Sequence, residues 1–176
     1  RDLRMSRGLG DVYKRQPESL YGKSKLAGEE FVRTLCHRYL IVRSAWVYGI
    51  GRDFVSTVLN AAADPTCPWL AVPTDRFASP TSADDLTAAV EQLIDHDTLG
   101  IYHIVCQGRC SRYDFAQAIL KAAHMEDKLE LHPIRAADAG STPSYTVLDN
   151  LMLRLDNLPQ PRPWKEALNE YINSLQ

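Results

Sequence analysis

The chain has 176 residues, of which 45% are hydrophobic and 24% are charged, and its formal net charge is −2. This composition is typical of a soluble globular domain with a substantial core, and the charge balance argues against nucleic acid or an anionic membrane as a partner. No apolar run approaches the roughly 20 residues that span a bilayer, and residues 1–16 lack the apolar centre of a secretory signal. We therefore expect a cytoplasmic protein.

The first 16 residues differ from the rest of the chain. They are rich in arginine, contain two glycines and show little periodicity. We predict a disordered, non-native leader in residues 1–16 and a globular part in residues 17–176. Because residues 11–16 resemble translated sequencing-adapter sequence, we expect a truncated reading frame whose native sequence starts near Pro17.

Helical and strand patterns alternate from Pro17 onward. Apolar periodicity predicts helices over residues 17–38, 53–63, 82–95, 111–123 and from Trp164 to near the end. Short apolar or alternating runs predict strands over residues 39–45, 70–72, 101–105 and 129–134, and residues 136–145 are predicted to form a loop. This alternation indicates an α/β fold with parallel strand pairing.

Local side chains predict where several helices start. Ser82 and Ser111 are each placed to cap a helix, and the carboxylates of Asp84 and Asp85 favour the positive end of the first of these helices. Pro163 suits the first position of the last helix because no backbone donor is needed there.

The four cysteines fit no disulfide framework by their spacing; they are Cys36, Cys67, Cys106 and Cys110. A metal site that includes Cys106, Cys110 and nearby His103 is an alternative. Zinc sites usually pair cysteines two to four residues apart and need a second pair. We therefore expect no metal and reduced, partly buried thiols.

Tyr21 and Lys25 are four residues apart in the first predicted helix, so their side chains share one face, a turn apart. A phenol can donate a proton to a carbonyl, and a neighbouring ammonium favours the phenolate by its charge. The pair therefore indicates carbonyl reduction. The alternative is an ordinary surface tyrosine and lysine, because this spacing alone is a weak motif.

Sequence blocks around this pair narrow the interpretation. Residues 21–29 resemble the active-site helix of the extended short-chain dehydrogenase/reductases. Further blocks resemble one group of these enzymes, the dTDP-4-dehydrorhamnose reductases; the blocks are residues 43–49, 53–55, 75–81, 100–103, 145–149 and 164–168. The resemblance covers nearly all of the chain from Pro17. It implies the C-terminal part of a Rossmann-like NAD(P)-binding fold with the small substrate-binding subdomain.

The resemblance implies roles for three residues. Tyr21 would be a catalytic proton donor to the 4-keto group of dTDP-4-dehydro-L-rhamnose, which is reduced to dTDP-L-rhamnose. Lys25 would be catalytic as well, and with Tyr21 it would bind the nicotinamide ribose of NADPH or NADH. Trp46 would bind the dTDP-sugar substrate as a flat apolar wall, with a core aromatic residue at a strand end as the alternative. The family also allows a homodimer.

Three features of the family are absent from this sequence. The glycine-rich loop that receives a dinucleotide pyrophosphate is missing, since Gly8 and Gly10 follow no strand. The serine or threonine expected upstream of Tyr21 is missing as well, and the family's Arg-Pro pair is replaced by Thr142 and Pro143. We therefore expect this chain to be inactive alone and prone to aggregation along its first strand.

Two other functions share parts of the pattern. A nucleotide-sugar epimerase or dehydratase would have the same fold, but sugar epimerases usually carry Asn-x-Tyr-Gly-Pro where this chain has residues 46–50. A non-enzymatic regulatory subunit of the methionine adenosyltransferase type shares the same sequence blocks. The presence of both Tyr21 and Lys25 favours an enzyme.

Overall fold

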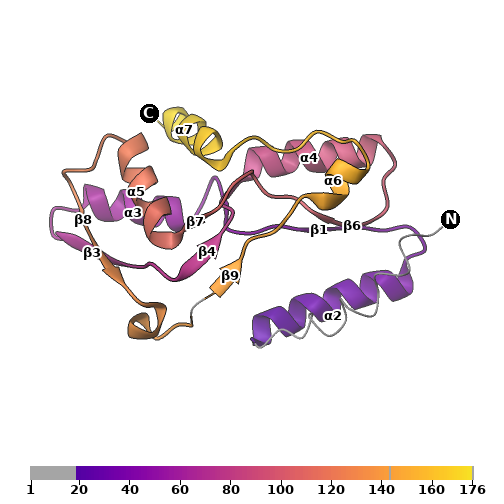
Figure 1. The fold of residues 1–176 in the computed structure, drawn as a ribbon, viewed down its shortest axis with the longest axis horizontal. Helices are drawn as coiled ribbons and strands as arrows, with labels where there is room; N and C mark the ends of the chain where they lie inside the picture. Colours follow the sequence, from indigo (N-terminus) through magenta and orange to yellow (C-terminus); the bar gives the residue numbers. More distant parts are fainter. Residues whose placement is uncertain (1–18, 143, 176) are drawn as a thin grey trace. The chain divides into compact units, whose positions relative to one another are not determined.

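The computed structural model describes residues 19–142 and 144–175 (Figure 1). The leader predicted for residues 1–16 and the start near Pro17 lie outside these residues. The chain divides into two compact units, residues 1–41 and residues 42–176. The globular part predicted for residues 17–176 stays a prediction.

The described part of the first unit contains helix α2 (Leu20–Leu35) and the start of strand β1 (Leu40–Arg43). The helix begins after Ser19, whose hydroxyl accepts a hydrogen bond from the Gly22 amide at 3.1 Å. It ends at Cys36, where the backbone becomes extended. The predicted helix is therefore confirmed, with an earlier end than residue 38.

No side chain of α2 is buried, and its large apolar side chains Leu20, Phe31 and Leu35 are exposed. Strand β1 is shorter than the predicted run 39–45 and only half-buried along its length. The predicted strand is therefore confirmed over Leu40–Arg43, with narrower bounds than residues 39–45.

The second unit holds the remaining elements. Its helices are α3 (Phe54–Ala63), α4 (Ala83–Asp95), α5 (Arg112–Ala122), α6 (Leu151–Leu155) and α7 (Trp164–Ser174), with a 3-10 turn η1 (Ala136–Ala139). Its strands are β2 (Val47–Tyr48), β3 (Trp69–Pro73), β4 (Arg76–Ala78), β5 (Thr81–Ser82), β6 (Gly100–His103), β7 (Cys110–Ser111), β8 (Glu130–Ile134) and β9 (Ser144–Thr146). Within this described part no helix is long and apolar enough to cross a membrane.

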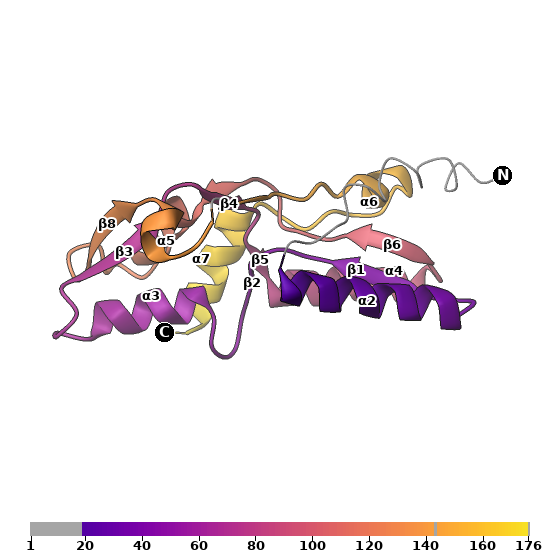
Figure 2. The same ribbon diagram turned by 90° about the horizontal axis from the view of Figure 1, so that it is seen from below.

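Strand pairing in the second unit is mostly parallel, as predicted. β2 pairs with β5, β3 with β8 and β4 with β9, all in parallel. Figure 2 shows β3 and β8 side by side, in a register that runs from Trp69 opposite Glu130 to Pro73 opposite Ile134. The exception is β7, which pairs antiparallel with β4.

Two details of the predicted layout were wrong. Residues 136–145 are not all loop, because they contain η1 and the start of β9, which is held by pairing with β4, distant in sequence. Pro163 is not the first residue of α7 but its cap, since its ψ of 138° is extended and the helix begins at Trp164. The caps predicted at Ser82 and Ser111 are confirmed.

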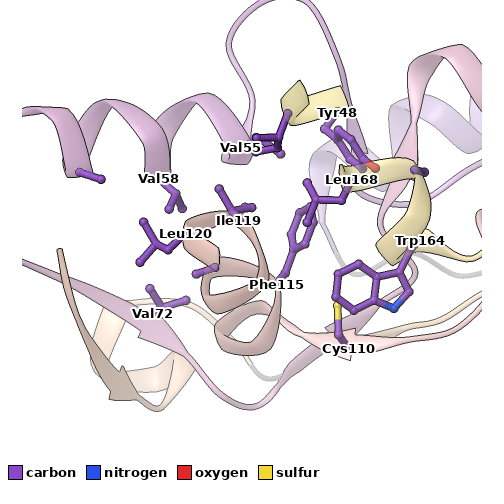
Figure 3. Close-up of a cluster of buried hydrophobic side chains, with 14 of the residues drawn as sticks. Tyr48, Val55, Val58, Val72, Cys110, Phe115, Ile119, Leu120, Trp164 and Leu168 are labelled. Atoms are coloured by element: carbon purple, nitrogen blue, oxygen red, sulfur yellow. The ribbon is translucent and has the colours of Figure 1, made fainter. Parts of the chain in front are cut away.

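The core of the second unit lies where α3, α5, α7 and β3 meet (Figure 3). Helix α5 supplies Phe115, Ile119 and Leu120 to this core, and the facing helices add valines from α3 and Leu168 from α7. These side chains repeat at helical spacing on each element, so one face of each helix is removed from water. Burial of these faces stabilises the unit.

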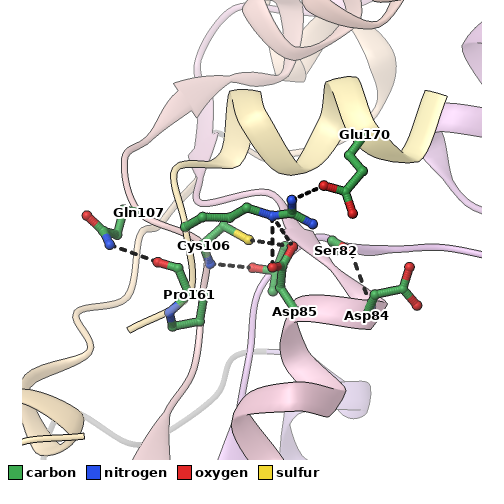
Figure 4. A network of polar contacts seen from close by, with 9 residues as sticks. Ser82, Asp84, Asp85, Cys106, Gln107, Pro161 and Glu170 are labelled. Atoms are coloured by element: carbon green, nitrogen blue, oxygen red, sulfur yellow. Dashed lines mark hydrogen bonds and ion pairs between the residues drawn. The ribbon is translucent and has the colours of Figure 1, made fainter. Parts of the chain in front are cut away.

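Polar contacts join α7 to the start of α4 (Figure 4). Arg162, just before α7, bonds the Asp85 carboxylate at 3.0 Å and also pairs with Glu170. The Glu170 and Asp85 carboxylates raise the pKa of the Arg162 guanidinium, and the bond from Arg162 in turn lowers the pKa of the Glu170 carboxyl. Because the pairs are partly exposed, we expect them to orient α7 more than to stabilise it.

Candidate functional site

The structure brings Tyr21 and Lys25 together in the first unit. Both lie on α2, and the Lys25 ammonium is 5.5 Å from the centroid of the Tyr21 ring. The Tyr21 side chain is 72% exposed, and within the described residues no carboxylate pairs with Lys25. The phenol of Tyr21 and the ammonium of Lys25 lie on one exposed helix face, where they can form hydrogen bonds with a ligand that carries a carbonyl and hydroxyl groups.

Trp46 lies in the second unit, between β1 and β2, and is half-buried. Its φ of 43° is in the left-handed region, which non-glycine residues rarely adopt. Its carbonyl accepts a hydrogen bond from the Thr81 amide at 3.2 Å, and its ring stacks on Phe115 at 6.2 Å between centroids. Trp46 thus contacts the core on one side, while a strained backbone of this kind is often found at functional sites.

Arg112, the first residue of α5, was missed in the sequence analysis. Its guanidinium carbon lies 4.2 Å from the Trp46 ring centroid and 4.1 Å from that of Phe54. Burial and the nearby positive charge of Arg76 lower the pKa of Arg112 to about 10, so it stays charged at neutral pH. No sequence signal marks it, because the rings that flank it come from distant parts of the chain.

Ser79 and Thr81 lie in and beside strand β5 (Thr81–Ser82), near the start of α4. Both residues are buried, and the Thr81 hydroxyl donates to the Ser79 carbonyl at 3.1 Å and accepts from the Cys106 amide at 3.3 Å. Ser79 also borders a small cleft of about 240 Å³ lined mainly by polar residues, including Gln107 and Arg154. The backbone therefore uses the Thr81 hydroxyl, which supports a structural role.

All four cysteines are free thiols in the structure. Cys36 is exposed and Cys67 half-buried, whereas Cys106 and Cys110 are buried and therefore less accessible than expected. Within the described ranges no group of three or more histidine, cysteine or acidic side chains could hold a metal ion. The reading of Cys106, Cys110 and His103 as a metal site gains no support from this geometry.

Burial should make two of the thiols unreactive. It raises the pKa of Cys106 to about 11 and that of Cys110 to about 12, so at about pH 8 fewer than about one in a thousand of these thiols is ionised. We expect a disulfide reagent to label Cys36 first, Cys67 more slowly, and Cys106 and Cys110 only after unfolding. Rapid labelling of four thiols in the native protein would contradict this burial.

The same raised pKa values predict a loss of stability at alkaline pH. A folded-state pKa above the unfolded value means that the folded protein holds its thiol protons longer. The protonated Cys106 thiol contributes fully to the free energy of unfolding below the thiol pKa of the unfolded chain, which is about 8.5. This contribution declines as the pH rises toward about 11. Unfolding followed across this range should show the decline, and Cys106→Ser should reduce it.

Helices that alternate with mostly parallel strand pairs define an α/β protein. Comparison with known proteins specifies the family. The RmlD substrate binding domain matches residues 11–176. The chain belongs to this family.

Relatives and solved structures agree with this assignment. The spore coat polysaccharide biosynthesis protein SpsK of Bacillus subtilis is 39% identical over 158 residues, covering 89% of this chain and 54% of the relative. A dTDP-4-dehydrorhamnose reductase structure from Clostridium acetobutylicum is 41% identical with a TM-score of 0.86, covering 92% of this chain and 57% of that chain. The Bacillus anthracis reductase, solved in complex with NADP, is 33% identical with a TM-score of 0.85 and the same coverage.

The chain therefore spans about half the length of the relatives that it matches. These matches confirm the predicted α/β class and the resemblance to the extended short-chain dehydrogenase/reductases. They do not test the predicted roles of Tyr21, Lys25 and Trp46, which stay predictions.

Proposed function

We propose that the protein that carries this chain is an NADPH-dependent oxidoreductase that reduces the 4-keto group of dTDP-4-dehydro-L-rhamnose to the alcohol of dTDP-L-rhamnose. The observation that carries this proposal is the Tyr21–Lys25 pair on an open face of α2 in a chain of the RmlD substrate binding domain family. The choice of substrate is supported by relatives that are named as dTDP-4-dehydrorhamnose reductases.

In this reaction Tyr21 is the general acid. A hydride added to C4 leaves negative charge on the former carbonyl oxygen, and the Tyr21 hydroxyl donates a proton to that oxygen. The phenolate that remains regains its proton from solvent, which the exposure of Tyr21 makes accessible. Lys25 favours the phenolate because its ammonium lies 5.5 Å from the ring.

The residues present fit the ribose end of a nicotinamide cofactor. Lys25 offers up to three hydrogen-bond donors, and the Tyr21 hydroxyl can accept or donate; neither side chain is committed to a carboxylate among the described residues. NADPH, when bound, supplies the hydride. The choice of NADPH over NADH rests on the NADP complex of the Bacillus anthracis relative.

Trp46 is proposed to form the apolar wall of the sugar-nucleotide site. Its half-buried ring and left-handed backbone are consistent with a ligand contact, although packing on Phe115 would account for the burial alone. A dTDP-sugar offers flat and apolar surfaces that a tryptophan ring can cover.

The test is an assay of the purified protein that carries this chain with dTDP-4-dehydro-L-rhamnose and NADPH. We expect NADPH oxidation and formation of dTDP-L-rhamnose in equal amounts, with a slower reaction for NADH. Interconversion of sugar epimers without NADPH loss would instead show an epimerase. Regulation of a methionine adenosyltransferase without any turnover would show the non-enzymatic alternative.

Several expectations about the whole protein stay predictions. They are a homodimer, a cytoplasmic location and the absence of nucleic-acid or membrane partners. Light scattering of the purified protein would measure the first of these.

A further inference from the structure

Arg112 is held between two aromatic rings, and no acceptor for its hydrogen bonds is present among the described residues. Its guanidinium carbon lies 4.2 Å and 4.1 Å from the centroids of the Trp46 and Phe54 rings. Those rings also stack on Phe115, so the core holds them in place. The guanidinium is therefore fixed in orientation before any ligand binds.

The environment of Arg112 differs from that of Arg154 and Arg162, which are paired with carboxylates. Arg154 pairs with Asp149, and Arg162 pairs with Asp85 and Glu170. Across the described ranges no carboxylate or carbonyl accepts a hydrogen bond from Arg112, although the residue is half-buried. A partly buried cation that lacks an acceptor is costly, which points to an anionic ligand.

A second cation lies beside Arg112. β4 pairs with β7, which ends at Ser111, directly before Arg112. Arg76 is the first residue of β4, and after burial its positive charge is the next cause that lowers the pKa of Arg112. Like charges this close repel each other. Arg76 bonds only the Ser144 hydroxyl, at 3.4 Å, so among the described residues neither arginine is neutralised by a carboxylate.

Stacking leaves the hydrogen-bond donors of Arg112 available. All five guanidinium N–H groups lie in the plane of the group, and rings above the plane do not use them. Planar guanidinium groups bind phosphate oxygens in bidentate fashion, more strongly than neutral donors do. Two neighbouring arginines match a ligand with two linked phosphates.

We propose that Arg112 and Arg76 bind the diphosphate group of the sugar nucleotide next to Trp46. The assignment to the substrate rests on the proposed function, because NADPH also contains a diphosphate. Trp46 then has two roles: its ring orients Arg112, and its left-handed backbone places that ring at the site. Arg112 is a binding residue in this assignment, and the proton donor stays Tyr21.

Calorimetric titration of the protein that carries this chain tests the site with three probes, which are dTDP, inorganic pyrophosphate and NADP+. Arg112→Met keeps an extended apolar side chain between the rings but removes the charge. We expect dTDP and pyrophosphate to bind about 10- to 100-fold more weakly to this variant, with NADP+ unchanged. Arg135→Met is the matched control, because Arg135 is an exposed arginine elsewhere in the unit.

Stability separates a binding role from a structural one. If Arg112 is kept for a ligand, Arg112→Met should unfold at the same or a higher temperature, because the repulsion with Arg76 is removed. Should that variant fail to fold, Arg112→Lys and Arg76→Met keep the test decisive, since each should weaken dTDP binding. Unchanged dTDP affinity in both of these variants overturns the proposal.

The remaining outcomes distinguish this inference from the proposed function. A weaker affinity for NADP+ instead of dTDP would assign the diphosphate to the cofactor and overturn the substrate assignment. Normal reductase turnover with an unchanged KM for the dTDP-sugar in Arg112→Met would overturn the diphosphate site and leave the function intact. Loss of dTDP binding in Arg112→Met, with no wild-type turnover, would support the site and refute the reductase.

Discussion

Replacing Tyr21 with phenylalanine in the protein that carries this chain should lower kcat by about 10²- to 10⁴-fold, the usual contribution of a positioned general acid. The substitution removes one oxygen atom from an exposed side chain, so we expect folding and the affinities for dTDP and NADP+ to stay close to wild type. Steady-state kinetics with the dTDP-sugar, together with titrations of both ligands, measure the effect.

Tyr39→Phe is the matched control for this experiment. Tyr39 lies beyond the far end of α2, and the 14-residue separation of Tyr21 from Leu35 corresponds to about 21 Å of helix. We expect the control to keep normal turnover. If Tyr21→Phe also kept normal turnover, Tyr21 would not be the proton donor, and another acid would have to be sought.

Phe115→Ala should produce the largest loss of stability in the second unit, about 3–5 kcal/mol in the free energy of unfolding. Phe115 is 1% exposed, and its ring contacts Trp46, Tyr48, Phe54 and Trp164 at centroid distances of 5.7 to 6.2 Å. Figure 3 shows Phe115 beside Tyr48 and Trp164. Removing the ring leaves a cavity where α5 meets α3 and α7. Urea unfolding of the wild type and the variant measures the difference.

Two further variants make the stability experiment specific. Phe115→Leu should lose less, because leucine fills most of the space that alanine leaves empty. Ile50→Ala should lose almost nothing, because Ile50 is fully exposed. Equal losses for Phe115→Ala and Ile50→Ala would show that the core is not centred on Phe115.

The Phe115 result also bears on the diphosphate site. Phe115 stacks on both rings that flank Arg112, so its loss should loosen Arg112 as well. We therefore expect Phe115→Ala to weaken dTDP binding under conditions where the variant is still folded. Arg112→Met should weaken dTDP binding without loss of stability. The contrast distinguishes Phe115, which holds the flanking rings in place, from Arg112, which is proposed to contact the ligand.

Much of the helical structure could be predicted from local sequence. Ser82 and Ser111 cap helices in the predicted places, because an N-cap hydroxyl satisfies amides only two or three residues away. The spacing of Tyr21 and Lys25 likewise determined their proximity, since four residues make about one helical turn. Interactions within one helical turn depend only on residues that are close in the sequence, so the sequence is enough to predict them.

The short strands could not be predicted in this way. β4, β7 and β9 have only two or three residues each, and each is held by a partner far along the chain. Such segments carry little periodicity, and their state depends on the neighbouring strand. For this reason the start of β9 was predicted to be part of a loop over residues 136–145.

Sequence patterns were sufficient to predict the α/β class, the family resemblance and the shared helix face of Tyr21 and Lys25. Only the tertiary structure showed the left-handed backbone of Trp46 and the position of Arg112 between Trp46 and Phe54. Helix caps and helix faces depend on residues within one turn, whereas Arg112 lies against the rings of Trp46 and Phe54, which are more than 50 residues away in the sequence. The proposed catalytic pair could therefore be predicted from local spacing, and the proposed diphosphate site could not.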